Sequence, residues 1–274
     1  MTTTTTTTTR SAELQDVPTL PVVLAFARRS IVNVFRVPGA VIPVLVMPLF
    51  FMLAFSGSFS GLARGPAPIV PAAKMIDWVL PYAILQGAAF SGMGATFGLA
   101  RDLEGGFYDR IRLAPVRRRA MLAGPVTAAL IRTAIPIVIV LTIGLALGGA
   151  RPTDWRGVLL LIVGAEGIAV IAALWGLGIV YRLRSQRAMG LVQIGIFISM
   201  FLSSAQVPVG KMQGWLHTVA RVNPLTNILR LVRQGFVPTG VRWEDTWGGL
   251  VAIVAVCAAM ALFAGRGLRK LDSE

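Results

Sequence analysis

The chain has 274 residues, of which 55% are hydrophobic and 14% are charged. Soluble domains carry about 25% charged residues, so this composition excludes a soluble globular protein and indicates an integral membrane protein. The formal net charge is +14, but the basic residues are scattered singly between apolar runs without interleaved aromatics. This scatter argues against nucleic-acid binding and agrees with the Lys and Arg excess in cytoplasmic loops of membrane proteins.

The first 37 residues precede the first apolar segment that could cross a membrane. Residues 1–17 begin with a run of threonines that cannot bury apolar surface, so we expect a disordered tail. Residues 18–37 carry Arg28, Arg29 and Arg36 too centrally for a span, whereas their apolar residues can share one side of a helix. This pattern predicts an amphipathic helix at the membrane interface; the alternative is a plain lead-in to the first span.

Six apolar segments are long enough to cross a bilayer, which takes about 20 residues of helix. They lie at about 39–59, 78–100, 120–149, 157–180, 189–206 and 246–264. The fifth is the weakest of the six because Gln193 and three serines dilute it. The sequence therefore predicts an all-α integral membrane protein with six transmembrane helices within residues 38–265 and a cytoplasmic tail over residues 266–274.

An even number of spans places both termini on the same side of the membrane. The segments on that side hold 16 of the 26 Lys and Arg residues, the segments on the other side hold 9, and Arg132 lies inside a span. Because Lys and Arg accumulate on the cytoplasmic side, we expect both termini in the cytoplasm. The stretch of residues 101–119, between the second and third spans, is then cytoplasmic as well.

Residues 101–119, RDLEGGFYDRIRLAPVRRR, form a strongly basic polar interval between two spans. Apolar residues recur inside it at spacings near three and four, which is typical of a short amphipathic helix; they are Leu103, Phe107, Ile111 and Leu113. We interpret the stretch as a helix held at the membrane surface with one face free for a partner. The alternative is an ordinary basic loop.

Two ionisable residues, Arg132 and Glu166, fall inside expected spans. At about 1.5 Å per residue, Arg132 lies about 18 Å from the start of the third span and Glu166 about 14 Å from the outer end of the fourth, so their depths nearly match. Because an unpaired charge in a bilayer is costly and often functional, we expect the two to pair or to flank a path through the membrane. The alternative is a third helix that extends into the cytoplasm, with Arg132 reaching the interface.

The segment of residues 207–245, between the fifth and sixth spans, carries helix signals of its own. Asn223 is a good N-cap, and Pro224 fits the first position of a helix. The apolar residues that follow form one stripe, with Arg230 and Arg233 off it. We predict one or two short external helices that re-enter or rest on the outer leaflet.

The chain carries no recognisable catalytic or metal-binding motif. Its only Gly-Lys pair, Gly210–Lys211, is followed by methionine, so a phosphate-binding loop is missing. One cysteine and one histidine cannot supply a Cys or His metal site, and no carboxylate pair is spaced for acid–base catalysis. We therefore expect neither catalysis nor a bound cofactor on this chain.

Two of these segments resemble the ABC-2 type permeases, the membrane subunits of bacterial ABC exporters, and especially the daunorubicin-resistance type. The family pattern in the cytoplasmic stretch is an acidic residue, a glycine, an acidic–basic pair, an apolar residue and a proline. It is matched in that order by Glu104, Gly106, Asp109, Arg110, Ile111 and Pro115. The family's external Asn-Pro with a later arginine is matched by Asn223, Pro224 and Arg233.

The resemblance implies the permease subunit of an ATP-binding cassette exporter for a hydrophobic or amphiphilic substrate, such as a drug, an antibiotic or a lipid. It implies a coupling helix that contacts a separate ATPase subunit, which binds ATP and Mg²⁺. The coupling residues are Leu103, Glu104, Gly106, Phe107, Asp109, Arg110, Ile111 and Pro115. It also implies a dimer with a second copy or a paralogue in the bacterial cell membrane. The alternatives are an ion-coupled transporter or channel that uses Glu166, and a membrane scaffold without transport.

Overall fold

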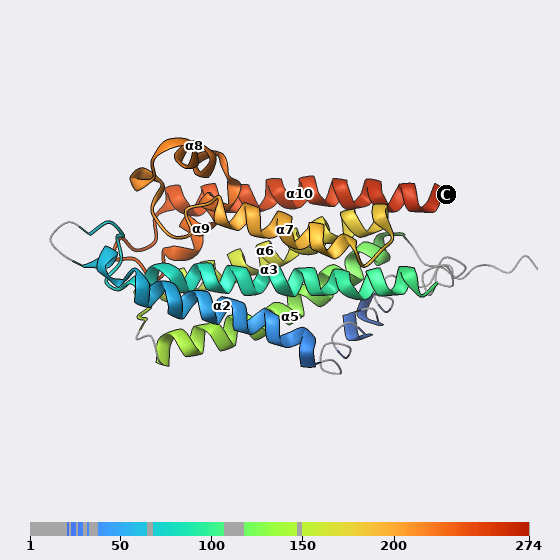
Figure 1. Ribbon diagram of the computed structural model, residues 1–274, viewed down its shortest axis with the longest axis horizontal. Helices are drawn as coiled ribbons and strands as arrows, with labels where there is room; N and C mark the ends of the chain where they lie inside the picture. Colours follow the sequence, from blue (N-terminus) through green and yellow to red (C-terminus); the bar gives the residue numbers. More distant parts are fainter. Residues whose placement is uncertain are drawn as a thin grey trace, which may run out of the picture.

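The computed structural model describes residues 38–64, 68–106, 118–146 and 150–273, together with residues 21, 23–25, 27–29 and 32. Every regular element among these residues is helical, which confirms the expected all-α fold (Figure 1). The long helices are α2 (Pro38–Ser58), α3 (Met75–Glu104), α5 (Arg118–Ala146), α6 (Trp155–Leu183) and α10 (Trp243–Ser273). The shorter elements are η1 (Ser60–Ala63), α7 (Ala188–Phe201), η2 (Val209–Lys211), α8 (Gly214–Val222) and α9 (Pro224–Arg233). The tail expected over residues 1–17 lies outside the described residues.

Four helices, α3, α5, α6 and α10, are long and apolar enough to cross a membrane. The first and fifth expected spans fall on shorter apolar helices, residues 44–58 of α2 and α7. Each expected span therefore coincides with an apolar helix. The largest difference is in the fifth, because α7 ends at Phe201 rather than near residue 206.

Helix α3 runs through the middle of the bundle. It packs against α2 and α5 on one side, and α6 and α7 also contact it (Figure 1). Every residue from Met75 to Met93 is buried, as expected for a helix that is surrounded by other helices. Small residues permit this packing: a Cβ added at Gly92 would overlap the backbone of Ala169 on α6.

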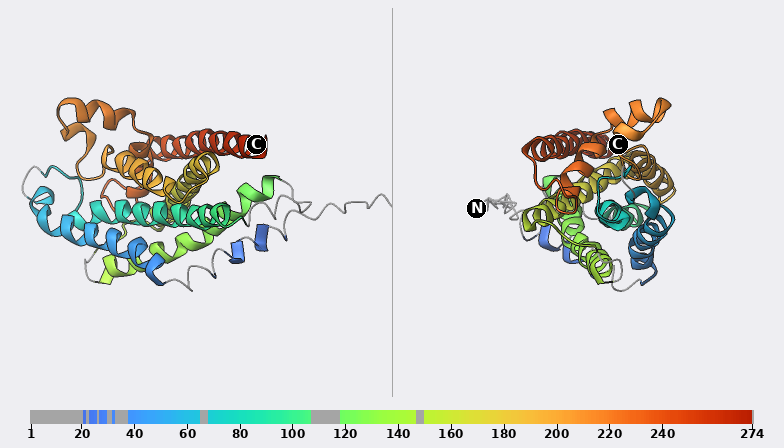
Figure 2. Two further views of the ribbon diagram at one scale, coloured as in Figure 1. Left: turned by 45° about the vertical axis from the view of Figure 1, so that its right-hand side comes forward. Right: turned by 90° about the vertical axis from the view of Figure 1, so that its left-hand side faces the viewer.

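The two ends of the bundle are built differently. The end of α3 and the chain's C-terminus lie at one end, and α8 and α9 lie at the other (Figure 1). Helix α8 lies across the direction of the long helices and projects from the bundle (Figure 2). Helix α9 instead packs among α3, α6 and α10, with most of its residues buried.

Candidate functional site at the two ends of the helix bundle

The first group of candidate residues lies at the end of α3. Leu103 and Glu104 occupy its last turn, and Gly106 follows with a φ of 66°, a left-handed conformation that glycine adopts without strain. Leu103 is half-buried against apolar residues of α6 and α10. The other five residues of the expected coupling helix lie outside the described residues; they are Phe107, Asp109, Arg110, Ile111 and Pro115.

Glu104 accepts three hydrogen bonds from the turn between α6 and α7. Its carboxylate accepts hydrogen bonds from Ser185 Oγ at 3.1 Å, from the Gln186 backbone N–H at 2.7 Å and from Gln186 Nε2 at 2.6 Å. Glu104 follows the apolar stretch of residues 78–100 and lies in a turn with three charged residues, so it is outside the membrane-spanning part of α3. The hydrogen bonds, led by the Gln186 N–H, hold the pKa of Glu104 below its ordinary value. Its carboxylate is thus engaged within the chain.

The second group, Arg132 and Glu166, lies inside α5 and α6. Arg132 is buried, and its guanidinium lies against Gly94 of α3. Glu166 is half-buried, with Oε2 enclosed and without a hydrogen-bond partner. Among the described residues, no hydrogen bond or ion pair joins Arg132 to Glu166. Matched depth therefore does not bring the two side chains together here, because Arg132 is directed toward α3.

The third group lies in the external segment, where Asn223 caps two helices at once. Its Oδ1 accepts the Leu225 N–H at 2.9 Å, and Pro224 occupies the first position of α9, so the predicted cap is confirmed. Its Nδ2 donates to Ser199 O at 2.7 Å and to Leu202 O at 3.0 Å. These carbonyls lie at the end of α7, where the last C=O groups of a helix have no N–H partner within the helix. The capping explains why α7 ends before residue 206.

Arg233, at the end of α9, is 3% exposed. Its Nε donates to Trp78 O at 3.0 Å, while Nη1 and Nη2 donate to Ser204 O and Ala205 O, both at 2.6 Å. The guanidinium also lies 3.6 Å from the centroid of the Trp78 ring, a cation–π contact. One side chain thus fastens α9 to the start of α3 and to the chain that follows α7.

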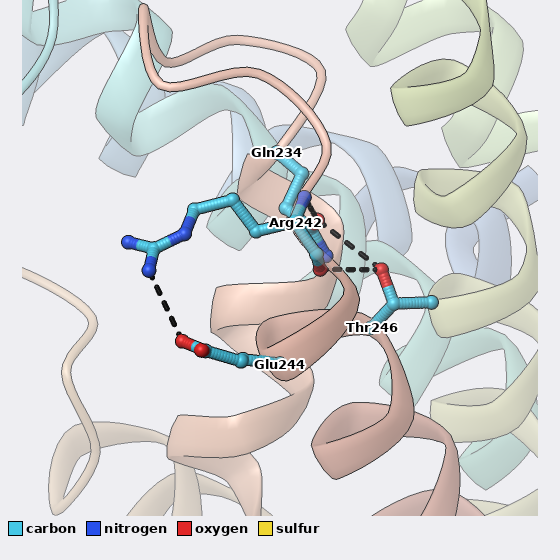
Figure 3. Close-up of polar contacts among 4 residues, drawn as sticks. All are labelled: Gln234, Arg242, Glu244 and Thr246. Atoms are coloured by element: carbon cyan, nitrogen blue, oxygen red, sulfur yellow. Dashed lines mark hydrogen bonds and ion pairs between the residues drawn. The ribbon is translucent and has the colours of Figure 1, made fainter.

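The next residue, Gln234, connects α9 to the start of α10. Its buried Oε1 accepts the Arg242 backbone N–H at 2.6 Å and Thr246 Oγ at 3.2 Å (Figure 3). Arg242 also pairs with Glu244 at 3.0 Å, but both side chains are exposed, so this pair contributes little. The sequence analysis missed Gln234, because a glutamine after a helix carries no signal of the partner it will meet.

Replacing Asn223 with alanine removes the caps of α7 and α9 together. We expect a loss of about 1–2 kcal/mol of stability, the range for a lost N-cap together with lost hydrogen bonds to partly exposed carbonyls. Thermal unfolding of the detergent-purified protein measures it. Asn227→Ala is the matched control, since the Asn227 side chain forms no hydrogen bond among the described residues. Equal melting temperatures for the two variants contradict the capping role.

Comparison with known proteins identifies the family of this chain. The family described as ABC-2 type transporter matches residues 21–237. The chain is 25% identical over 234 residues to the daunorubicin resistance ABC transporter permease protein DrrB1 of Streptomyces coeruleorubidus, covering 85% of this chain and 79% of that protein. It is 25% identical over 240 residues to the probable doxorubicin resistance ABC transporter permease protein DrrC of Mycobacterium tuberculosis, covering 85% and 83%. It is 23% identical over 230 residues to the putative transport permease ycf38 of Pyropia yezoensis, covering 81% and 75%. Because the family match extends over most of its length, the chain belongs to the ABC-2 type transporter family.

Proposed function

We propose that this chain forms the transmembrane path of an exporter for a hydrophobic or amphiphilic compound, such as a drug, an antibiotic or a lipid. As an ABC-2 permease it is a multi-pass membrane subunit without a catalytic domain, and the ATPase is a separate subunit. The family match over residues 21–237 carries the proposal. The drug-resistance relatives and the almost wholly apolar spans support the substrate class.

The proposed topology has six spans, formed by α2, α3, α5, α6, α7 and α10, with both termini in the cytoplasm of a bacterial cell. In support, the end of α3 and the C-terminus lie at the same end of the bundle (Figure 1). Helix α7 has 14 residues, or about 21 Å, which is shorter than the hydrocarbon core. Helix α9 packs beside the chain after α7, so α8 and α9 complete the outer side as short external helices, with α9 re-entering the bundle.

We further propose that residues 101–119 dock on the ATPase and that the permease dimerises with a second copy or a paralogue. Helix α3 ends at Glu104, and Gly105 and Gly106 allow the chain to turn from the span into the docking segment. Asp109 and Arg110 supply opposite charges there, suited to orienting a bound partner. When ATP closes the ATPase subunits, the rigid end of α3 passes the motion to the membrane.

Purification of the tagged chain from its native membrane, followed by an ATPase assay of the eluate, tests the docking proposal. We expect an ATPase to co-purify and Arg110→Glu to reduce its recovery about tenfold, as for a lost charge-assisted contact. Arg230→Glu, an equal charge change on the external helix α9, is the control and should leave recovery unchanged. Emergence of the wild-type chain alone under mild detergent rejects the assignment of an ATPase partner.

The two intramembrane charges extend the proposal. Since Glu166 Oε2 is enclosed without a hydrogen-bond partner and the Arg132 guanidinium lies against Gly94 of α3, we place both residues beside the transport path rather than in an ion pair. The same unpartnered carboxylate favours a second candidate function, an ion-coupled transporter that uses Glu166. Accumulation driven by a proton gradient without ATP, and lost in Glu166→Gln, would identify that second function.

A further inference from the structure

A bidentate ion pair joins the end of α3 to the N-terminal segment, meaning here the described helical residues 21, 23–25, 27–29 and 32. Arg29 Nη2 donates to Asp102 Oδ1 at 2.7 Å, and Arg29 Nη1 donates to Asp102 Oδ2 at 3.0 Å. The two residues are 73 positions apart in the chain. The Arg29 side chain is 40% exposed and the Asp102 side chain 21%, so the pair is only partly screened by water. Two parallel hydrogen bonds fix the orientation of one element on the other as well as their distance.

Glu104 makes the corresponding connection on another side of α3. Its carboxylate holds Ser185 and Gln186 in the turn between α6 and α7. Arg184 ends α6 in a left-handed conformation, with a φ of 50°, which turns the chain sharply toward α7. The turn therefore meets α3 as a defined structure.

The spacing of the two carboxylates explains how one helix end makes both connections. Successive side chains on an α-helix are about 100° apart, so Asp102 and Glu104, two positions apart, point to nearly opposite sides of α3. One reaches the N-terminal segment, and the other reaches the α6–α7 turn. Both connections lie immediately before Gly105 and Gly106, where the helix stops within the proposed docking segment of residues 101–119.

We propose that Asp102 and Glu104 are positioning residues that make the end of α3, the N-terminal segment and the α6–α7 turn move as one unit when the ATPase moves the docking segment. This rests on the proposed function. Apolar packing alone resists separation of these elements but permits sliding, whereas directional charged hydrogen bonds resist both. Asp102 and Glu104 thus bond to other parts of this chain, and the role proposed for these bonds is to distribute motion.

Spin labels on the N-terminal segment and on α7 test whether the elements move together. Ala25 and Gly190, both exposed, are changed to cysteine after the native Cys257 is replaced by alanine. Distance distributions are measured in the complex with its ATPase, without nucleotide and after trapping with ATP and vanadate. We expect a single narrow distance in both states for the otherwise unchanged chain, since the labelled elements are linked through α3.

Charge exchange at the ion pair gives the first arm of the test. Arg29→Asp and Asp102→Arg, each alone, should raise the separated population in the trapped state about fivefold, the upper end for a partly exposed pair. The double variant restores opposite charges and should return the narrow distance. Arg28→Asp is the matched control, because Arg28 is exposed and no hydrogen bond among the described residues joins it to Asp102.

An exchange of amide and carboxylate gives the second arm. In Glu104→Gln the shape is kept, but the hydrogen bonds from Ser185 and Gln186 lose the negative charge that strengthens them. Adding Gln186→Glu restores a carboxylate opposite an amide, and with it a charge-assisted hydrogen bond. We expect broadening in the trapped state for the single variant and recovery in the double.

Three results overturn the proposal: unchanged distributions in all single variants, broadening that is already complete without nucleotide, or exchanges that fail to restore the narrow distance. The second of these would identify contacts that only hold the resting structure. If no ATPase accompanies the chain, the proposed function and this proposal fall together. An associated ATPase with unchanged distributions overturns only the proposal made here.

Discussion

Replacing Arg233 with alanine is expected to destabilise the protein by about 3–5 kcal/mol, the range for removing one partner from a buried charged network. The substitution leaves the carbonyl groups of Trp78, Ser204 and Ala205 without the donors that Arg233 provides. It also removes the cation–π contact with the Trp78 ring. Helix α9 then loses these bonds to α3 and to the chain after α7, while Asn223 still joins it to the end of α7. Thermal unfolding in detergent should show a fall of about 10 °C or more.

The control for this variant lies one turn earlier on the same helix. Arg230 is exposed, so Arg230→Ala removes an equal charge and should change the melting temperature little. Arg233→Lys keeps the charge but not the planar arrangement of donors, and we expect it to recover less than half of the loss. If Arg233→Ala and Arg230→Ala have the same melting temperature, the three hydrogen bonds of Arg233 do not hold α9 in place.

Gly157→Ala is expected to have the second largest effect, a loss of about 3 kcal/mol, as for overpacking that rotamer changes cannot relieve. A Cβ at Gly157 would overlap backbone atoms of Gly235. Relief requires α6 to move away from the chain between α9 and α10. That movement also strains the hydrogen bond from the Thr153 N–H to Gly235 O, which is 2.7 Å long. The measurement is the melting temperature together with the fraction of protein that stays monodisperse.

Gly248→Ala supplies the comparison for this substitution. Gly248 lies on α10 and an added Cβ meets no atom within 4 Å, so alanine there should be neutral or slightly stabilising, since alanine favours helix. The reciprocal change, Gly235→Ala, should destabilise as Gly157→Ala does, because it meets the same backbone contact from the other side. A Gly157→Ala variant as stable as Gly248→Ala shows that the two segments separate freely.

Local patterns predicted the helices well, because each signal acts within a few residues. Apolar runs of span length placed all six expected spans on apolar helices. The Asn223–Pro224 pair predicted the start of α9, since an N-cap hydrogen bond joins residues that are two apart in sequence. The same kind of reasoning put the end of the fifth span near residue 206, whereas α7 ends at Phe201. The Asn223 side chain that caps this end comes from a later segment, so the residues of α7 carry no signal of it.

For the candidate residues too, the sequence pointed to the residue, but only the structure shows its partners. Arg233 was singled out by resemblance, but its three carbonyl partners come from segments 28 to 155 positions away. Glu104 was likewise singled out by resemblance, and the residues that its carboxylate bonds, in a turn 81 and 82 positions away, carry no signal in the sequence. The pairing of Arg132 with Glu166 was inferred from depth alone, and depth does not specify which side of a helix a residue occupies.

The sequence by itself determined that this protein is a membrane-spanning helical chain, where its helices lie and which segments mark its family, because hydropathy, capping and local motifs are properties of neighbouring residues. Only the tertiary structure decided which polar side chain meets which backbone. Side chains that bond across the bundle meet groups far away in the sequence, and those partners are set by the packing of distant helices. The connections at Asn223, Arg233, Asp102 and Glu104 are therefore properties of the assembled bundle.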